Sequence, residues 1–478
     1  MRYILYMTIL FLILPFVLSR PFFGLCIYYI VSILQPKFLC WRPEIQDAMI
    51  VGVPLVIGAI MIGAKRIDIV PKLHARTNRV IGVTRRLVRS SLLEPAWPVF
   101  LFGCLIAYLI VNRVLSPFSM EQTGLQFRTL CKVLLVVALM TGLASDYRRF
   151  RILIIVIGLA AAVWAIKGGI KVVLLGPHQV YGKTYDNNLF ALTSVMALPI
   201  VFYFGLSVRH VRWRAVLLVC SGLIILAIIG SRSRAGFVAM AFVVVCMALS
   251  SRYRIRALFG VALVGVAALA MVGGEIQERV HSIIAYRQDQ SAHSRLEVWD
   301  YAQTLLAKYP VMGVGFNHFE TARRTFIGSD RAAHNIFLQN MTELGVLGHP
   351  IWLAIIFGSI FSLFRFMRWS RVLPPEYRWA YYWSRGLLLA LVAFCIHGLF
   401  HNEEYSELMF AVVGLNVALQ VVTRRELQEN RLLGQAEVAT QRRTRRKQQA
   451  RGGRPTGRRG RKWSGGLPPF GLRPGAAT

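Results

Sequence analysis

The chain has 478 residues, of which 55% are hydrophobic and only 16% are charged, and its mean hydropathy is +0.51. Soluble domains carry about 25% charged residues, so this composition excludes an ordinary soluble protein. The net charge of +34 would suit a nucleic-acid partner, but residues 424–478 alone hold 15 Lys and Arg against 3 Glu. Most of the other basic residues lie in short segments between apolar runs, which indicates a membrane protein and no nucleic-acid partner.

Apolar runs long enough to cross a bilayer recur along the whole chain. They are 3–19, 21–36, 47–64, 96–115, 128–144, 150–166, 188–206, 213–230, 233–250, 256–272, 346–367, 384–401 and 405–422. The first run resembles a signal peptide, but no small-residue cleavage site follows, so we expect a retained helix. The fold class is therefore an all-α polytopic membrane protein, a bundle of about 12–13 transmembrane helices.

The number of helices depends on the first two runs. If 3–19 and 21–36 both cross, there are thirteen helices and the N-terminus faces outward. If one is half-inserted, as Pro15, Pro21 and Pro36 allow, there are twelve and both termini are cytoplasmic. We favour twelve.

The distribution of basic residues predicts the orientation. Arginine-rich connections follow the runs that end near residues 64, 144, 206, 250 and 367, and this side is expected to be cytoplasmic. The opposite side holds one large loop, and between residues 273 and 333 seven Lys and Arg balance seven Asp and Glu. We expect membrane helices at 1–64, 96–272 and 346–422, a basic cytoplasmic loop at 65–95, a periplasmic catalytic loop at 273–345, and a basic disordered cytoplasmic tail at 423–478.

The first candidate site is the Gly-Ser-Arg-Ser-Arg-Ala-Gly motif at 230–236, on the expected outer side. Arg232 and Arg234 there oppose the positive-inside trend, and charged groups at membrane depth are costly and usually functional. A guanidinium group is suited to phosphate oxygens. The alternative is an ordinary tight turn whose arginines extend toward the interface.

The second candidate begins where the large loop meets the run at 346–367. His334 can accept a proton from a hydroxyl near neutral pH, and Asn335 and Glu343 lie nearer one helix face. His334 and Glu343 are about half a turn out of phase, so a direct dyad is not expected. A structural histidine is the alternative interpretation.

Two further groups of residues are more ambiguous. Asp186 and Asn187 precede an apolar run, where capping a helix is the default role and hydrogen bonding to a sugar is the minor one. His397 and His401 are spaced to hold a metal on one helix face, but histidines at a helix end are more often interfacial. We expect no metal and no cofactor.

Three motifs together resemble the O-antigen ligase and polymerase superfamily. The family's His-Asn-x-x-Leu-x-x-x-x-Glu-x-Gly-x-x-Gly pattern matches His334, Asn335, Leu338, Glu343, Gly345 and Gly348. Its Ser-Arg-small turn matches Ser233, Arg234 and Ala235. Its Ser-Arg…Trp…Pro-x-x-Gly-x-Gly-x-x-x-Phe run matches Ser294, Arg295, Trp299, Pro310, Gly313, Gly315 and Phe319.

The N-terminal half is similar to a narrower branch, the probable O-glycosylation ligases associated with exosortase A and exopolysaccharide clusters. This similarity is carried by Arg20-Pro21, by Ser32, Pro36 and Trp41, and by the run from Asp186 to Pro199.

The resemblance implies a glycosyltransferase in the bacterial inner membrane. Its donor would be a glycan on a polyprenyl diphosphate, its acceptor a hydroxyl of a lipid, protein or polysaccharide, and the transfer would be metal-independent. Arg234 and Arg295 would hold the diphosphate and His334 would orient or deprotonate the acceptor. Because Arg232 precedes Arg234, the arginine that takes the family role stays open.

Two alternatives remain. One is a polymerase of polysaccharide repeat units, and the other is a solute transporter of the same superfamily. A transporter should show inverted repeats and charges at mid-membrane, and neither is evident in the sequence.

Overall fold

The protein is described here by a computed structural model. Its described residues are 2–40, 46–73, 80–90, 92–93, 96–118, 123–176, 186–251, 253–256, 258–260, 262, 290–328 and 332–452. They divide into two compact units, Met1–Asp68 with Leu87–Gln428, and Ile69–Arg86 with Glu429–Thr478.

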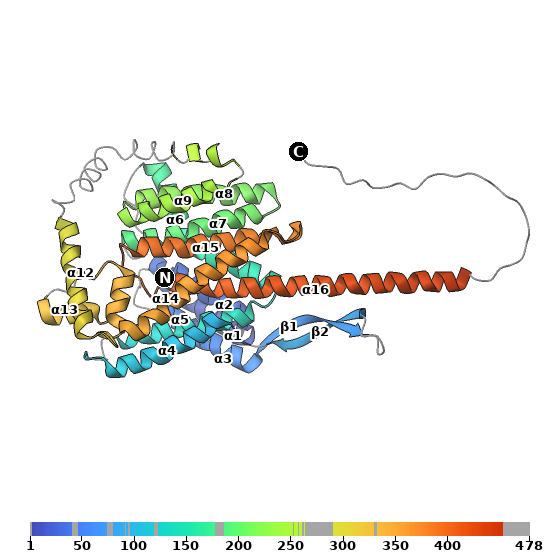
Figure 1. The fold of residues 1–478 in the computed structure, drawn as a ribbon, viewed down its shortest axis with the longest axis horizontal. Helices are drawn as coiled ribbons and strands as arrows, with labels where there is room; N and C mark the ends of the chain where they lie inside the picture. The colour runs from blue at the N-terminus through green and yellow to red at the C-terminus, as the bar shows by residue number, and fades with distance from the viewer. Residues whose placement is uncertain are drawn as a thin grey trace, which may run out of the picture. The chain divides into compact units, whose positions relative to one another are not determined.

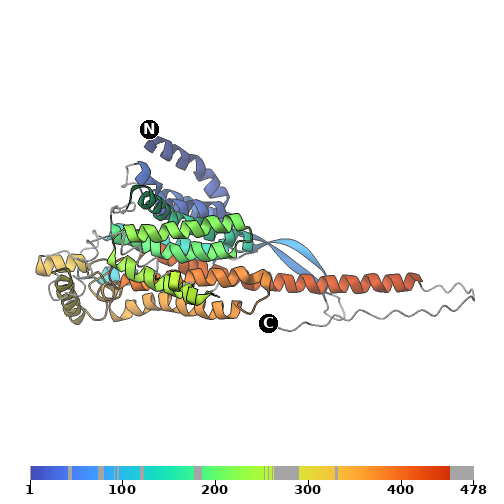
Figure 2. The ribbon, with the colours of Figure 1, turned by 90° about the horizontal axis from the view of Figure 1, so that it is seen from above.

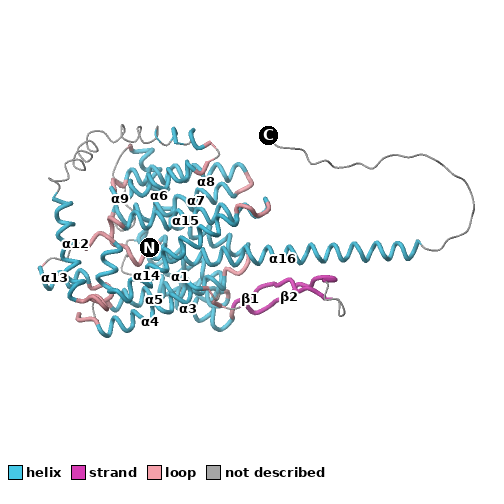
Figure 3. The backbone as a smooth tube through the Cα atoms, in the orientation of Figure 1, coloured by secondary structure: helices cyan, strands magenta, loops and turns pink. Residues whose placement is uncertain are grey.

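The first unit is a bundle of α-helices (Figures 1 and 3). Its helices in chain order are α1 (Arg2–Ser19), α2 (Pro21–Tyr29), η1 (Ile30–Leu34), η2 (Pro36–Cys40), α3 (Asp47–Ile62), α4 (Trp97–Leu115), α5 (Gly124–Leu143), α6 (Tyr147–Leu175), α7 (Asn187–Ser207), α8 (Val211–Gly230), α9 (Arg234–Leu249), α12 (Gln290–Lys308), α13 (Phe319–Ile327), α14 (Ile336–Ser370), η4 (Pro375–Tyr377), α15 (Arg378–Gly398) and α16 (Glu407–Gly452). The last of these continues beyond the first unit.

The prediction of an all-α polytopic membrane protein is confirmed. Within the described part of the chain, nine helices are long and apolar enough to cross a membrane, and three shorter apolar helices cover 21–34, 47–62 and 234–249. The expected run at 256–272 lies almost entirely outside the described residues. Many large apolar side chains of these helices are exposed on the surface, as expected of a bundle that lipid surrounds.

Two segments differ from the expectation. The stretch expected as a basic loop contains strands β1 (Ala64–Leu73) and β2 (Val80–Ser90), which form a two-stranded sheet. β-branched residues alternate with polar ones around Ile67 and Ile69, a pattern that favours a strand. Helix α16 extends to Gly452, although disorder was expected from residue 423, because Arg, Gln, Glu and Ala favour helix even where they bury nothing.

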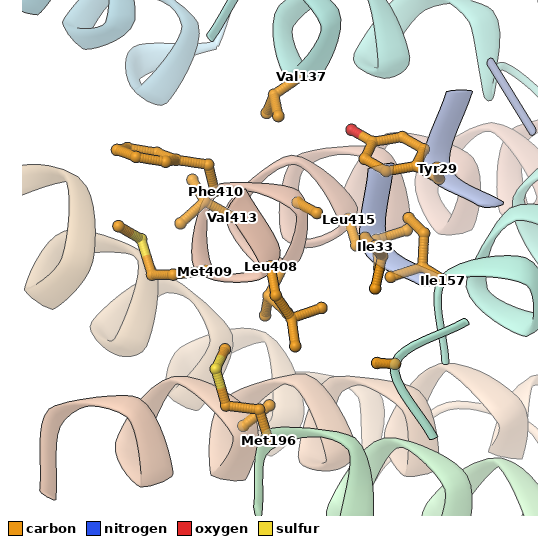
Figure 4. Close-up of a cluster of buried hydrophobic side chains, with 14 of the residues drawn as sticks. Tyr29, Ile33, Val137, Ile157, Met196, Leu408, Met409, Phe410, Val413 and Leu415 are labelled. Atoms are coloured by element: carbon orange, nitrogen blue, oxygen red, sulfur yellow. The ribbon is translucent and has the colours of Figure 1, made fainter. Parts of the chain in front are cut away.

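The core of the bundle forms where α7 packs against α6, α8, α9 and α15. Figure 2 shows the bundle from a second direction. Around the start of α16, buried side chains from distant segments form part of the same core, among them Tyr29, Val137, Met196 and Phe410 (Figure 4). This apolar core holds the polar ends of the helices in fixed positions.

The two ends of the bundle differ in chemistry. At one end Arg425 donates to the Ser145 carbonyl oxygen at 3.2 Å, so the basic turn after α5 lies beside α16. At the other end lie α12 and α13, which pack on α14 (Figure 1). The candidate motifs of the sequence lie at this second end.

Candidate active site

The arginine motif forms the turn between α8 and α9. The turn is tight because Arg232 adopts a left-handed backbone conformation, with φ of 56°. Ser233 Oγ accepts a hydrogen bond from the Gly236 N–H at 3.1 Å and so caps α9. Arg234 is exposed and Arg232 is half-buried. The turn therefore places two guanidinium groups at a helix N-terminus, where negative charge is favoured.

The start of α7 is bonded directly to this turn. Asp186 caps α7 by accepting from the N–H groups of Asn188 and Leu189. Asn187 Nδ2 donates to the Ser231 carbonyl oxygen at 3.2 Å, and Ser233 Oγ donates to Asn188 Oδ1 at 2.7 Å. The capping role expected for this segment is thus present, and its neighbours position the arginine turn.

His334 lies at the start of α14. It has a positive φ of 50°, and Asn335 caps the helix by accepting from the Phe337 and Leu338 N–H groups. The indole of Trp299 in α12 donates to the Ala333 carbonyl oxygen at 2.8 Å, which holds α12 next to His334. Arg295 precedes Trp299 by four residues in α12, and its side chain lies outside the described residues.

The loop between α15 and α16 joins these elements through His401. This side chain is 4% exposed, and its ring packs at 5.4 Å between centroids against His397 of α15. Burial lowers the pKa of His401 to about 4, an effect that the Asp186 carboxylate opposes and His334 reinforces. The starts of α7 and α14 are therefore both within electrostatic range of His401.

Glu343 has a different environment from the other predicted site residues. It is 1% exposed, and its Oε2 accepts from the Asn317 N–H at 3.0 Å and from the Tyr405 hydroxyl at 3.3 Å. Gln339 Nε2 lies 3.4 Å from its Oε1. Glu343 thus ties α14 to the turn after Gly315 and to the loop before α16.

The Pro-x-x-Gly-x-Gly motif fits into a break in α14. The break lies at Gly345, whose φ is 62° and ψ is −170°. There the Gly315 N–H donates to the Glu343 carbonyl oxygen at 3.0 Å, and the Val346 N–H donates to the Pro310 carbonyl oxygen at 2.9 Å. The turn at Gly313 and Gly315, called the glycine turn below, therefore provides hydrogen-bond partners for backbone groups of α14 that an unbroken helix would pair internally.

Helix α4 supports the glycine turn from the other side. Asn112 is fully buried, and its side chain donates to the Met312 carbonyl oxygen at 2.6 Å and accepts from the Phe316 N–H at 2.8 Å. Ser116 Oγ donates to the Val314 carbonyl oxygen at 2.9 Å. Neither residue was identified from the sequence, since Asn112 belongs to an otherwise ordinary apolar run and Ser116 directly follows it.

A cavity of about 560 Å³ opens beside Glu343. It is rich in carboxylates and amides, and its polar lining includes Glu320, Glu343, Glu403, Glu404, Glu407, Asn317, Asn402 and Gln339. Sequence reasoning did not find this cluster, because 62 to 65 positions separate the α14 residues from their partners Glu404 and Tyr405. Within the described residues, no group of three or more His, Cys, Asp or Glu side chains is placed to hold a metal ion.

Part of the chain at this end of the bundle matches a known protein family. Residues 215–353 match the family model described as O-Antigen ligase. The matched region contains the arginine turn, α12, the glycine turn and the His334–Gly348 motif. This match supports the O-antigen ligase superfamily and a membrane glycan-transfer or ligase function. No curated protein matches the chain.

Proposed function

We propose that the chain is a glycan ligase of the bacterial inner membrane, acting at the periplasmic face. It transfers a glycan from a polyprenyl diphosphate to an acceptor hydroxyl without a metal ion. The observation that carries the proposal is that the arginine turn is hydrogen-bonded to the start of α7, and that Asp186 before α7 and His334 before α14 both act electrostatically on His401. The arginine turn and His334 lie within the region that matches the family.

In this proposal the arginines bind the diphosphate of the donor. Arg234 is exposed at the start of α9 and Arg232 is beside it, so both reach an anion from the same turn. Arg295 is assigned to the same diphosphate by the family resemblance alone. Their fixed positive charge stabilises the negative charge that develops on the leaving diphosphate.

His334 acts on the acceptor. The acceptor oxygen attacks the anomeric carbon and its proton passes to the imidazole. The bond from the anomeric carbon to the phosphate oxygen breaks, and polyprenyl diphosphate leaves, so the anomeric configuration inverts. Asp186, Asn187, Asn335 and Glu343 hold the surrounding backbone in place through the bonds described above.

The family branch is a finer part of the proposal. The likeness of residues 20–41 and 186–199 to ligases associated with exosortase A favours an exopolysaccharide or surface glycan as the transferred chain. The acceptor class is then the main specificity to identify.

The proposal is tested by measuring glycan transfer by variants of the protein in cells that lack the native gene. We expect His334→Ala and Arg234→Ala each to abolish transfer at unchanged protein level, since one removes the base and the other a leaving-group contact. Arg212→Ala is the matched control, because Arg212 is an exposed arginine at the opposite end of α8. Full transfer by both site variants would refute the proposal.

The same strains separate a ligase from a polymerase. Loss of a ligase leaves polymerised chains on the lipid carrier, whereas loss of a polymerase leaves single repeat units. Mass spectrometry of the lipid-linked glycans distinguishes the two outcomes.

A further inference from the structure

The carboxylate-lined cavity next to the proposed catalytic end has no role in the transfer chemistry described above. It is bordered by α5, α13, the start of α14 and the loop before α16. Five glutamates line it, against one arginine, Arg324. Because like charges repel, this lining disfavours a diphosphate or an acidic sugar.

One lining group has an unused hydrogen-bonding atom. Glu404 is 3% exposed, and its Oε1 accepts from Gln339 Nε2 at 3.2 Å. Its Oε2 is buried with no hydrogen-bond partner. A buried polar atom without a partner is costly, so a ligand that offers a hydroxyl or ammonium donor would be stabilised there.

Burial also raises the pKa of the Glu404 carboxyl, and the neighbouring Glu343 raises it further. A raised pKa favours the protonated carboxyl, and a protonated carboxyl can both donate and accept a hydrogen bond. Sugar hydroxyls require this combination. The Oε1 of neighbouring Glu407 is likewise buried without a partner.

The rest of the lining suits the faces and edges of a sugar ring. The rings of Phe316 and Tyr405 lie 4.8 Å apart between centroids, and both residues border the cavity. Asn317 and Asn402 add amide groups. The cavity therefore combines aromatic rings with convergent polar groups, as a site for a polar small molecule does.

The loop from residue 399 to residue 406 connects the cavity to the proposed catalytic residues. His401, which interacts electrostatically with His334, is three residues before Glu404 in this loop. The same short loop therefore contributes both to the cavity and to the surroundings of His334.

We infer that this cavity is a carbohydrate subsite that binds an uncharged or amino-bearing sugar of the glycan substrate and rejects acidic sugars. The inference rests on the proposed function. The sugar belongs either to the donor glycan or to the acceptor.

Binding is measured on the full-length protein in detergent by saturation-transfer NMR with three soluble probes, maltotriose, chitosan trisaccharide and trigalacturonate. We expect saturation transfer to one or both of the first two and none to the acidic probe. Glu404→Gln should reduce the signal at least tenfold, whereas Glu376→Gln, an exposed glutamate at the opposite end of the bundle, should not.

A second variant is needed because a folding defect in Glu404→Gln would also abolish probe binding. Thr129 is exposed at the cavity, so Thr129→Trp should block the site without burying new atoms. The inference is wrong if no probe gives a signal, or if both variants bind as the native protein does. It is also wrong if CaCl₂, and no sugar, raises the melting temperature of the native protein but not of Glu404→Gln.

His334→Ala separates this inference from the proposed function. That variant should lose transfer but retain probe binding. Retained transfer by His334→Ala together with normal probe binding would refute the catalytic proposal and leave the subsite intact.

A photo-crosslinking amino acid at position 129 identifies the source of the sugar in living cells. A crosslinked glycan that persists when donor synthesis is deleted comes from the acceptor, and one that disappears comes from the donor. The absence of any crosslinked glycan would overturn the inference.

Discussion

At the scale of single residues, the candidate site combines charged groups that are exposed with charged groups that are buried. Arg234 is exposed at the start of α9, whereas His401 and Glu404 are buried in the loop before α16. Exposed arginine can exchange a bound anion rapidly, while buried groups keep defined positions and protonation states. The first kind suits a lipid-linked substrate that enters and leaves, and the second suits the sugar that is positioned.

The buried imidazole of His401 makes stability depend on pH. Its pKa is lowered to about 4 by burial, whereas an unfolded histidine has a pKa of about 6.5. Between these values the unfolded chain binds more protons, so stability falls as the pH drops from about 6.5 toward 4. We expect the melting temperature in detergent to fall more between about pH 7 and pH 5 for the native protein than for His401→Asn.

The comparison with His401→Asn cancels the contribution of groups that do not interact with His401, whereas Asp186, His334 and His397 interact with it. Equal falls in melting temperature for the two proteins would contradict the burial of a neutral imidazole at this position.

At the scale of elements, the break in α14 organises the site. Asn335 caps the first part of the helix, and Gly345 lets the glycine turn enter before the second part begins. The same break positions Glu343 to accept from Asn317 and Tyr405. The broken helix α14 therefore contacts both the turn after Gly315 and the loop before α16.

Gly345→Ala tests this arrangement. The backbone at Gly345, with φ of 62°, is open almost only to glycine, and such strain costs about 1–3 kcal/mol. A Cβ there would also meet the Val311 carbonyl oxygen and lie 2.6 Å from the Gly313 nitrogen. We expect a clearly lower melting temperature in detergent and less protein in the membrane.

Gly103→Ala in α4 is the matched control, because a Cβ there meets no heavy atom within 4 Å. We expect that variant to be as stable as the native protein or slightly more so. If the two variants were equally stable, the break in α14 would not require glycine.

At the scale of the whole molecule, the proposed function requires the end of the bundle with the candidate site to face the periplasm. Basic residues gather near the opposite end, around Ser145 and Arg425 and in the connection from α14 to α15. A cytoplasmic location of that end would agree with the positive-inside rule.

Cysteine labelling tests this orientation in a variant that lacks the seven native cysteines. The two labelling positions are Thr325→Cys and Val372→Cys. Thr325 is an exposed residue of α13, and Val372, which follows α14, is 81% exposed. We expect a membrane-impermeant maleimide to label position 325 in cells with a permeable outer membrane, and position 372 only after lysis. The reverse pattern would put the proposed site in the cytosol and exclude a lipid-linked donor on the periplasmic side.

The membrane class and the location of most helices follow from the sequence alone. A bilayer requires about 20 apolar residues per helix, so runs such as 188–206 and 213–230 identify α7 and α8 without knowledge of their neighbours. The short motifs around Arg234 and His334 are also visible in one dimension, because the type and spacing of residues within a turn are local properties.

Only the tertiary structure decided which of these local features meet. The sequence does not show that Asn188 contacts Ser233 or that Gln339 contacts Glu404. Both contacts depend on how the apolar helices pack against one another. The glutamates at 403, 404 and 407 line a cavity together with Glu343 of α14 and Glu320 of α13, from which they are distant in the sequence. Hydropathy determines that a helix lies in the membrane, but the packing of its faces determines which polar ends come together.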